Sequence, residues 1–341
     1  MEFNVGLTRD LATPTGGFSW GDISIETIAG LPWKFIDVDS ENFTPESVSE
    51  CEAIVFAGPG VIPGSFGQPE NSPLLIARLG VGFDSINLEE CTRAGVAVTI
   101  TPDGSRKPVA TAALALTLAT THRLGIKMAQ AKSGAWKDRI NPLGDGLNGK
   151  TIATIGFGNI ASEFFRLLSP FDARFISYDP WKKQEDAEPF GVTLVSLEEL
   201  MATADVIVVM AQLTSETHHL IDAEKLRMCK PTTMLINISR GPIVNELDLI
   251  QALHNGVIAG AGLDVFENEP LSVESPLLDM PNVIATPHNI SWTHELGTGM
   301  GASAMNAVKM ISQGKIPPFI VNKEVIDTPQ FQSKLQRFQE K

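Results

Sequence analysis

The chain has 341 residues, 43% of them hydrophobic, so it is long enough for two domains and apolar enough to bury a core in each. It carries 26 Lys and Arg against 40 Asp and Glu, and the net charge of -14 argues against a general nucleic-acid or anionic-membrane surface. No secretory signal opens the chain and no apolar run reaches about 18 residues, so we expect a cytoplasmic protein without a membrane segment. The three cysteines lack metal-site spacing and predict buried thiols and no metal site: Cys51, Cys91 and Cys229.

The first hundred residues alternate short apolar runs with polar and helical stretches, which is the rhythm of βαβ units. The predicted strands of this α/β layer are NVGLT, WKFIDV, AIVFAG and VAVTIT, and NLEECTRAG is a predicted helix. The next stretch, 108–131, is rich in Ala and Leu at helical spacing. Pro108 at its start predicts a long linking helix that begins there.

The chain beyond Lys150 contains six apolar runs that predict strands covered on both faces. These runs are TIATIG, RFISYD, ADVIVVM, TMLINIS, AGAGLDVF and NVIATPH. After them, residues 294–314 predict a helix that returns to the first domain, and the polar last residues are expected to fray.

A glycine-rich sequence, GFGNIA, joins the first of these six strands to the helical run SEFFRLL. Gly156 permits a tight turn, and Gly158 removes a Cβ that would block a pyrophosphate. The amides of Asn159 and Ile160 would face the phosphates at the positive end of the helix. Asp179, after the next strand, can accept hydrogen bonds from both ribose hydroxyls and would repel a 2′-phosphate, so we predict NAD (NADH) as cofactor and disfavour NADP. The simpler alternative is that the glycines only join a strand to a helix.

Four motifs occur in the order and spacing of a known family: RLGVGFDSINLEECTRAGV, NISRGPIVNE, GAGLDVFENEP and TPHNISW. On these motifs the chain resembles the D-isomer-specific 2-hydroxyacid dehydrogenase family, from about Leu75 to Trp292. The resemblance implies an α/β fold of two doubly wound parallel-sheet domains. It implies a Rossmann nucleotide domain, residues 105–292, inserted in a flavodoxin-like substrate domain of residues 1–104 and 293–341. It also implies a homodimer formed through the nucleotide domain.

Three polar residues, Arg240, Glu269 and His288, each follow a predicted strand, where ligands of parallel sheets bind. His288 can exchange a hydroxyl proton, because imidazole is the side chain that titrates nearest neutral pH. The resemblance places Glu269 against His288, where it would orient the ring and favour its protonated form. Arg240 offers a planar fork that can bind a 2-oxo acid and polarise its carbonyl. Taken singly, each of the three could be an ordinary surface or packing residue.

The resemblance extends to further binding residues. Asp264 would hold the nicotinamide carboxamide, although a buried capping role is the alternative. The backbone amides of Gly80, Val81 and Gly82 would hold the substrate carboxylate, although the segment could be an ordinary turn. Thr214 and Thr217 in QLTSETHHLI match a family stretch near the cofactor, although helix capping explains Thr214 or Ser215 equally well. Further cofactor candidates in the family stretches are Thr217, Ile238 and Ser239.

Some positions depart from the family pattern. Met210 and Gln212 stand where many relatives carry His and Pro, which puts the cofactor contacts there in doubt. Arg106 and Lys107 introduce two positive charges, and Arg106 would meet a second anionic group of the substrate or simply face solvent. The Trp292 pattern after His288 resembles that of glyoxylate and hydroxypyruvate reductases. Trp292 would form a bulky wall beside the substrate, unless it packs at the domain junction.

Together these features predict an NAD-dependent oxidoreductase that interconverts a D-2-hydroxy acid and its 2-oxo acid. Two alternatives remain open: a phosphonate (phosphite) dehydrogenase that uses the same three residues, and an NAD(H)-sensing corepressor-like interaction protein. Formate dehydrogenase is disfavoured, because that branch uses Gln where Glu269 stands. The remaining histidines are predicted to be structural or exposed: His122, His218, His219, His254 and His294.

Overall fold

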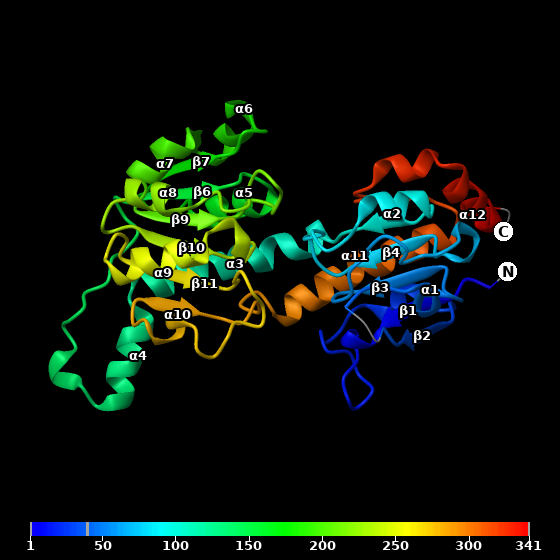
Figure 1. Ribbon diagram of the computed structural model, residues 1–341, viewed down its shortest axis with the longest axis horizontal. Coiled ribbons are helices and arrows are strands. Elements are labelled where there is room, and N and C mark those ends of the chain that lie inside the picture. Colours follow the sequence, from blue (N-terminus) through cyan, green and yellow to red (C-terminus); the bar gives the residue numbers. More distant parts are fainter. Residues whose placement is uncertain (1, 39–40, 340–341) are drawn as a thin grey trace. The chain divides into compact units, whose positions relative to one another are not determined.

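The computed structural model describes residues 2–38 and 41–339. The chain forms two compact units (Figure 1). The first unit contains the chain up to Ser105 and from Trp292 onward, and the second contains Arg106–Ser291. Each unit is built on its own parallel sheet, and the predicted α/β fold class is confirmed.

Within the described residues, the first unit has five parallel strands in the order β2-β1-β3-β4-β5, which is the flavodoxin-like order. The strands are β1 (Val5–Thr8), β2 (Trp33–Ile36), β3 (Ala53–Phe56), β4 (Leu75–Arg78) and β5 (Ala97–Thr99). Four of them confirm the predicted runs. β4 was not predicted, because a run of four residues that ends on a charged side chain gives a weak pattern.

Helices cover both faces of this sheet. They are α1 (Pro45–Val48), α2 (Leu88–Arg93), α11 (His294–Ser312) and α12 (Pro329–Gln339). Adjacent strand residues point to opposite faces. Val55 therefore packs in one core with Met300 of α11, while Ile54 packs in the other with Cys91 of α2. α11 is the predicted helix 294–314, and it belongs to the first unit.

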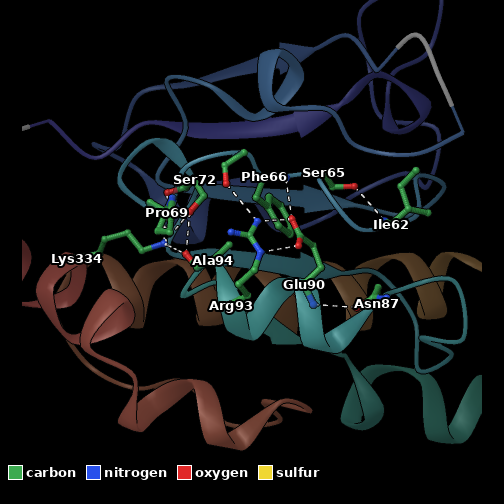
Figure 2. A network of polar contacts seen from close by, with 11 residues as sticks. Ile62, Ser65, Phe66, Pro69, Ser72, Asn87, Glu90, Arg93, Ala94 and Lys334 are labelled. Carbon is green, nitrogen blue, oxygen red and sulfur yellow. Dashed lines mark hydrogen bonds and ion pairs between the residues drawn. The ribbon is translucent and has the colours of Figure 1, made fainter.

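The expectation that the polar C-terminal residues fray is wrong for α12. Phe331, Leu335 and Phe338 recur at helical spacing, and all three are buried. The ammonium of Lys334 is buried as well, and it donates to Ser72 Oγ at 3.0 Å and to two backbone carbonyls (Figure 2). These contacts fasten the helix, although its composition is polar.

Within the described residues, the second unit has a seven-stranded parallel sheet in the order β12-β11-β10-β9-β6-β7-β8. The strands are β6 (Thr151–Ile155), β7 (Arg174–Tyr178), β8 (Val192–Leu194), β9 (Val206–Val209), β10 (Met234–Asn237), β11 (Gly260–Leu263) and β12 (Val283–Ala285). Their order is that of a Rossmann sheet with one more strand. Six confirm the predicted runs. β8 was not predicted, because it is a three-residue edge strand with an exposed central threonine.

Helices also cover both faces of the second sheet. They are α3 (Pro102–Thr121), α4 (Leu124–Ser133), α5 (Asn159–Leu168), α6 (Gln184–Ala187), α7 (Leu197–Thr203), α8 (Ala223–Met228), α9 (Glu246–His254) and α10 (Pro276–Asp279). Ile152 packs with Phe164 of α5, and the next residue, Ala153, packs with Leu200 of α7 on the opposite face. The near-continuous apolarity of these strands reflects this double coverage.

The predicted start of the linking helix at Pro108 is wrong. α3 begins at Pro102, where a missing N–H costs nothing, and Pro108 lies inside the helix. The predicted single helix is also divided: Arg123 has a φ of 56°, and α4 continues at an angle of 59° to α3. In the described part of the chain no single helix could cross a membrane, and α3 with α4 meets the criteria of length and apolarity only as this bent pair.

Candidate active site

The glycine turn predicted from GFGNIA begins directly after β6. Gly156 has a φ of 95°, and a Cβ there would lie 2.7 Å from the amide nitrogen of Ala211, so the position requires glycine. Gly158 is the N-cap of α5, and a Cβ on it would meet no atom within 4 Å. Asn159 and Ile160 are the first two residues of α5. The space beside Gly158, at the positive end of the helix, is therefore open to an anionic ligand.

Asp179 follows β7 directly and lies beside this turn. Its Oδ2 accepts a hydrogen bond from the Phe157 amide at 2.8 Å, and its Oδ1 accepts one from the Trp181 amide at 2.9 Å. Each oxygen retains a second lone pair for a further donor. β6 lies between β7 and β9, where the strand order reverses, and open α/β sheets bind ligands at such a point.

The loop after β9 contains the candidate Thr217. Its hydroxyl donates to the Gln212 carbonyl at 2.7 Å and accepts from the Thr214 amide at 2.7 Å. The hydroxyl therefore closes a local turn. Ser239, from the loop after β10, donates its hydroxyl to the Ala211 carbonyl, so the two loops are joined. Ile238 precedes it in the chain and directly follows β10.

Arg240 is held three residues beyond the end of β10. The buried Asn237 donates from Nδ2 to the Arg240 carbonyl at 3.0 Å and accepts from the Ser239 amide at 3.1 Å. The Arg240 guanidinium donates from Nη1 to the Ser239 carbonyl at 2.8 Å. An asparagine at the end of a buried strand thus fixes the backbone that carries the arginine.

His288 and Glu269 form a hydrogen-bonded pair. Nδ1 of His288 lies 2.7 Å from Oε2 of Glu269, and Oε1 of Glu269 accepts from the Phe266 amide at 3.0 Å. The His288 backbone has a φ of 53°, and its amide donates to the Asp264 carbonyl at 2.8 Å. Because Glu269 engages Nδ1, the other ring nitrogen, Nε2, is the one that can meet a ligand. The His288 side chain is 46% exposed, which leaves it accessible.

The charge state of Glu269 follows from opposing effects. Burial alone would raise the pKa of this carboxyl group. The hydrogen bonds from His288 and from the Phe266 amide, with the positive charges of His288 and Arg240, outweigh burial and hold the pKa below its usual value. Glu269 is therefore a carboxylate at neutral pH, as an acceptor for the imidazole requires.

Asp264 is 3% exposed and organises the loop of His288. Its Oδ1 accepts hydrogen bonds from the Thr286 hydroxyl at 2.6 Å, the Asn289 amide at 3.0 Å and the Ile290 amide at 3.1 Å. Burial raises the pKa of Asp264, and these bonds oppose the increase. The predicted capping role is therefore present, and Oδ2 retains the capacity to accept a ligand amide.

The loops of Arg240 and Glu269 are in backbone contact. A Cβ on Gly241 would lie 1.9 Å from the carbonyl carbon of Phe266, so only glycine allows the approach. The positive charge of Arg240 lowers the pKa of Glu269, which is hydrogen-bonded to His288. The second unit thus brings the three predicted catalytic residues together at the carboxyl ends of β10, β11 and β12.

Four substrate candidates lie in the first unit. Gly80 has a φ of 132°, but its amide donates to Thr101 Oγ1 at 2.9 Å. Across residues 2–38 and 41–339, the amides of Val81 and Gly82 have no protein acceptor, so these two suit the predicted anion contact better than Gly80. Trp292 is 58% exposed and contacts the ring of Trp20, with centroids 4.5 Å apart.

Arg106 is engaged within the second unit. Its Nε lies 3.9 Å from Oε2 of Glu163, a buried residue of α5 whose other oxygen is bound by Arg166. This ion pair gives Arg106 a structural contact between α3 and α5, in addition to any contact with a ligand.

The prediction of buried thiols is confirmed. Cys51, Cys91 and Cys229 are all free and buried. Burial raises the pKa of Cys51 to about 11, that of Cys91 to about 12 and that of Cys229 to about 11. The thiolate is therefore rare at neutral pH, and these side chains are poor nucleophiles.

One group of residues beside the site was missed. His219 was predicted to be structural or exposed, and the pairing that the prediction did not include is with Glu267: Nε2 of His219 lies 2.6 Å from Oε1 of Glu267, two residues before Glu269. Asn245, the N-cap of α9, lies against the same ring. The N-cap is recognisable in the sequence, because Asn precedes an acidic first turn. Nothing in the sequence pattern joins it to His219.

Comparisons with known proteins agree with this architecture. The family model described as D-isomer specific 2-hydroxyacid dehydrogenase, NAD binding domain, matches residues 114–289. A glyoxylate reductase of Thermococcus litoralis is 40% identical, over 86% of this chain and 90% of the relative.

Two solved structures are similar over nearly the whole chain. One is an NADPH-dependent glyoxylate/hydroxypyruvate reductase of Sinorhizobium meliloti in complex with NADP and malonate, with a TM-score of 0.77, 26% identity and coverage of 95% of this chain and 98% of that one. The other is an NAD-complexed D-isomer specific 2-hydroxyacid dehydrogenase of Lactobacillus delbrueckii, with a TM-score of 0.72, 23% identity and coverage of 93% and 99%. This chain therefore belongs to the D-isomer specific 2-hydroxyacid dehydrogenase family and is an oxidoreductase that interconverts hydroxy and oxo acids with NAD(P).

Proposed function

We propose that the chain uses NAD(H) to interconvert a small 2-oxo acid and the corresponding D-2-hydroxy acid. The observation that supports this most directly is the 2.7 Å contact between His288 Nδ1 and Glu269 Oε2, because the loop of Glu269 also packs against the loop of Arg240. The carboxylate occupies Nδ1, so Nε2 is the atom that exchanges a proton with the substrate oxygen.

In the reduction direction, Arg240 binds the substrate carboxylate and polarises the neighbouring carbonyl, because a guanidinium can donate two parallel hydrogen bonds. When bound, NADH would supply the hydride for C2 of the substrate. His288 donates a proton from Nε2 to the carbonyl oxygen, and Glu269 stabilises the imidazolium before transfer. In the oxidation direction the same nitrogen accepts the hydroxyl proton.

The residues of the second unit fit a dinucleotide. The open space beside Gly158, with the first amides of α5, suits the pyrophosphate. Oδ2 of Asp264 suits the carboxamide, which donates N–H groups to a carboxylate. Asp179 suits the ribose hydroxyls and repels a 2′-phosphate, which favours NAD over NADP. The remaining proposed contacts come from the loops after β9 and β10, at Thr217, Ile238 and Ser239.

Gly158→Ala is expected to weaken NADH binding by about 10-fold or more without reducing stability. The added Cβ meets no protein atom within 4 Å, so it intrudes only on the pyrophosphate. A tenfold loss of NADH affinity corresponds to a loss of about 1.4 kcal/mol in binding free energy. Fluorescence titration with NADH and thermal unfolding measure the two effects. Unchanged NADH affinity in the folded variant would remove Gly158 from the cofactor site.

For the substrate we propose an acid of the glyoxylate or hydroxypyruvate class. The Thermococcus litoralis relative is a glyoxylate reductase, and the Sinorhizobium meliloti protein is a glyoxylate/hydroxypyruvate reductase. Trp292 would provide a bulky wall that restricts the substituent on C2. The amides of Val81 and Gly82, with that of Gly80 in a lesser role, would add contacts to the carboxylate. Arg106 would meet a second anionic group only after release from Glu163.

A panel of glyoxylate, hydroxypyruvate and pyruvate, assayed through the absorbance of NADH, tests the proposed function. We expect NADH oxidation with at least one of these acids. Turnover of phosphite with NAD, and of none of the acids, would instead identify a phosphonate dehydrogenase. NADH binding without any turnover, together with capture of a protein partner, would indicate a corepressor-like role. Either of these outcomes contradicts the proposal.

We also propose that two copies associate through the second unit. α4 and the segment after it project from this unit (Figure 1) and expose Leu124, Met128, Trp136, Ile140 and Leu143. An exposed apolar set of this size is typical of an interface. We expect the wild-type chain to sediment as a dimer and the triple variant Trp136→Ser, Ile140→Ser, Leu143→Ser as a monomer. Leu247→Ser, at an exposed leucine of α9, is the control, and a monomeric wild-type chain would refute the proposal.

A further inference from the structure

A second histidine–carboxylate pair lies beside the proposed catalytic pair. His219 Nε2 is 2.6 Å from Glu267 Oε1, and both side chains are about one-third exposed or less. His219 comes from the loop after β9 and Glu267 from the loop after β11. The loop of Arg240, after β10, runs between them in strand order. The pair therefore joins the two loops that flank the loop of Arg240.

His219 is also attached to the loop of Arg240 through its backbone. Its amide donates to the Pro242 carbonyl at 2.8 Å, two residues beyond Arg240. The connection continues as a short parallel bridge between Ile221 and Val244. His219 has a φ of 52°, a left-handed conformation that non-glycine residues adopt at a cost. The surrounding contacts maintain this conformation and with it the position of the ring.

Glu267 is attached to the start of α9 by two reciprocal bonds. Its Oε1 accepts from the Glu246 amide at 3.1 Å, and its own amide donates to Oε2 of Glu246 at 3.0 Å. In the same loop, Glu269 accepts a hydrogen bond from the Phe266 amide. The segment that carries Glu269 is thus fixed at Phe266 and Glu267, where Gly241 also packs against it.

The hydrogen-bonding pattern shows which ring nitrogen of His219 carries the proton. Oδ1 of Asn245 accepts from the Asp248 amide at 3.1 Å, because Asn245 caps α9, so its Nδ2 is the group facing His219. Nδ2 lies 3.4 Å from Nδ1 of the ring, which must act as acceptor. The proton is then on Nε2 and is donated to Glu267. Both ring nitrogens are occupied, unlike those of His288.

From this geometry we propose that His219 and Glu267 are positioning residues that hold the loops of Arg240 and Glu269 in register for binding the substrate carboxylate. The inference rests on the proposed function of Arg240 and Glu269. His219 is not a proton donor to substrate, because neither nitrogen is left for it. Its effect is transmitted through the Pro242 carbonyl to Arg240, and through Glu267 to the segment of Glu269.

The test compares His219→Leu with His219→Gln. Both variants bear the same left-handed backbone, but only glutamine offers a donor to Glu267 and an acceptor to Asn245. We expect the leucine variant to raise the KM for the 2-oxo acid and to lower kcat/KM by about 10- to 100-fold, because small misplacements of binding groups have effects of this size. The glutamine variant should recover most of this loss. His254→Leu, at an exposed histidine on the last turn of α9, is the control.

A purely structural role would give a different pattern. Partial unfolding lowers the amount of active enzyme, and so the apparent kcat, but leaves KM unchanged. A leucine variant with wild-type KM, or a glutamine variant as impaired as the leucine one, would therefore overturn the inference. The double variant His219→Leu, Glu267→Ala should be no worse than the poorer single variant, because the two residues act as one unit.

A second measurement separates this inference from the proposed function. Amide hydrogen exchange across 240–245 and 265–270 should be faster in His219→Leu than in the wild-type chain, whether or not any acid is turned over. If the wild-type chain reduces no acid on the panel, the proposed function fails. The hydrogen-exchange measurement then still tests whether His219 positions the two loops. Unchanged exchange in both segments would overturn the positioning role even in an active enzyme.

Discussion

His288→Ala is expected to lower kcat by about 10²- to 10⁴-fold, which is the usual contribution of a general acid or base. The variant keeps Arg240 and Glu269, so the acid can still bind, but no group remains to exchange the proton. NADH binding should persist, because the glycine turn and Asp179 are separate from the imidazole. Steady-state kinetics and fluorescence titration with NADH measure the two effects.

The control for this variant is His254→Ala, which removes an exposed imidazole from the same unit. It should have wild-type kinetics. If His288→Ala instead lost NADH binding while its thermal unfolding stayed normal, the histidine would belong to the cofactor site and not to the proton transfer. Near-normal kcat would remove it from the mechanism altogether.

Arg240→Lys is expected to raise KM and lower kcat, with a combined loss in kcat/KM of about 10- to 100-fold. Lysine keeps the charge but has no planar fork, so at least one hydrogen bond to the carboxylate or the carbonyl is lost. A hydrogen bond to a charged group contributes about 1.5–3 kcal/mol, which corresponds to a loss of this size.

Arg227→Lys is the matched control, since Arg227 is an exposed arginine of α8. That variant should be indistinguishable from the wild-type chain. The NADH affinity of Arg240→Lys should also be normal, which would localise the defect to the acid. Wild-type values of both KM and kcat in Arg240→Lys would show that the guanidinium takes no part in binding the substrate.

Most of the fold could be predicted because buried parallel strands have a simple signature. Each long apolar run in the second half of the chain became a strand, since helices on both faces require apolar residues at successive positions. β8 was not predicted, because a three-residue strand at the edge of the sheet does not need a long apolar run. α12 escaped because its buried Phe331 and Leu335 are diluted by polar residues, and the burial of Lys334 depends on carbonyls far away in the sequence.

The linking helix shows a different limit. A proline is a good marker of a helix start, but Pro102 and Pro108 both lie in α3. The sequence alone does not show at which of the two prolines the helix begins. The break at Arg123 depends on a left-handed backbone that a non-glycine residue rarely adopts. Neither feature follows from local propensity alone.

The candidate site could be predicted as a set of loops but not as a set of contacts. Arg240, Glu269 and His288 follow strands, and neighbouring strands of a parallel sheet bring their ends together. That Gly241 must be glycine because Phe266 lies against it is visible only in three dimensions. The same holds for the Gly80 amide, which Thr101 engages, and for the ring of His219.

The hydride transfer can be followed with a deuterated cofactor. The wild-type chain is incubated with glyoxylate or hydroxypyruvate and NADH carrying deuterium at both C4 hydrogens, and the products are analysed by mass spectrometry. We expect a 2-hydroxy acid that carries one deuterium on C2, formed by the wild-type chain and formed about 10²- to 10⁴-fold more slowly by His288→Ala. Formation of an unlabelled hydroxy acid, or of no hydroxy acid from any acid on the panel although NADH binds, would contradict this expectation.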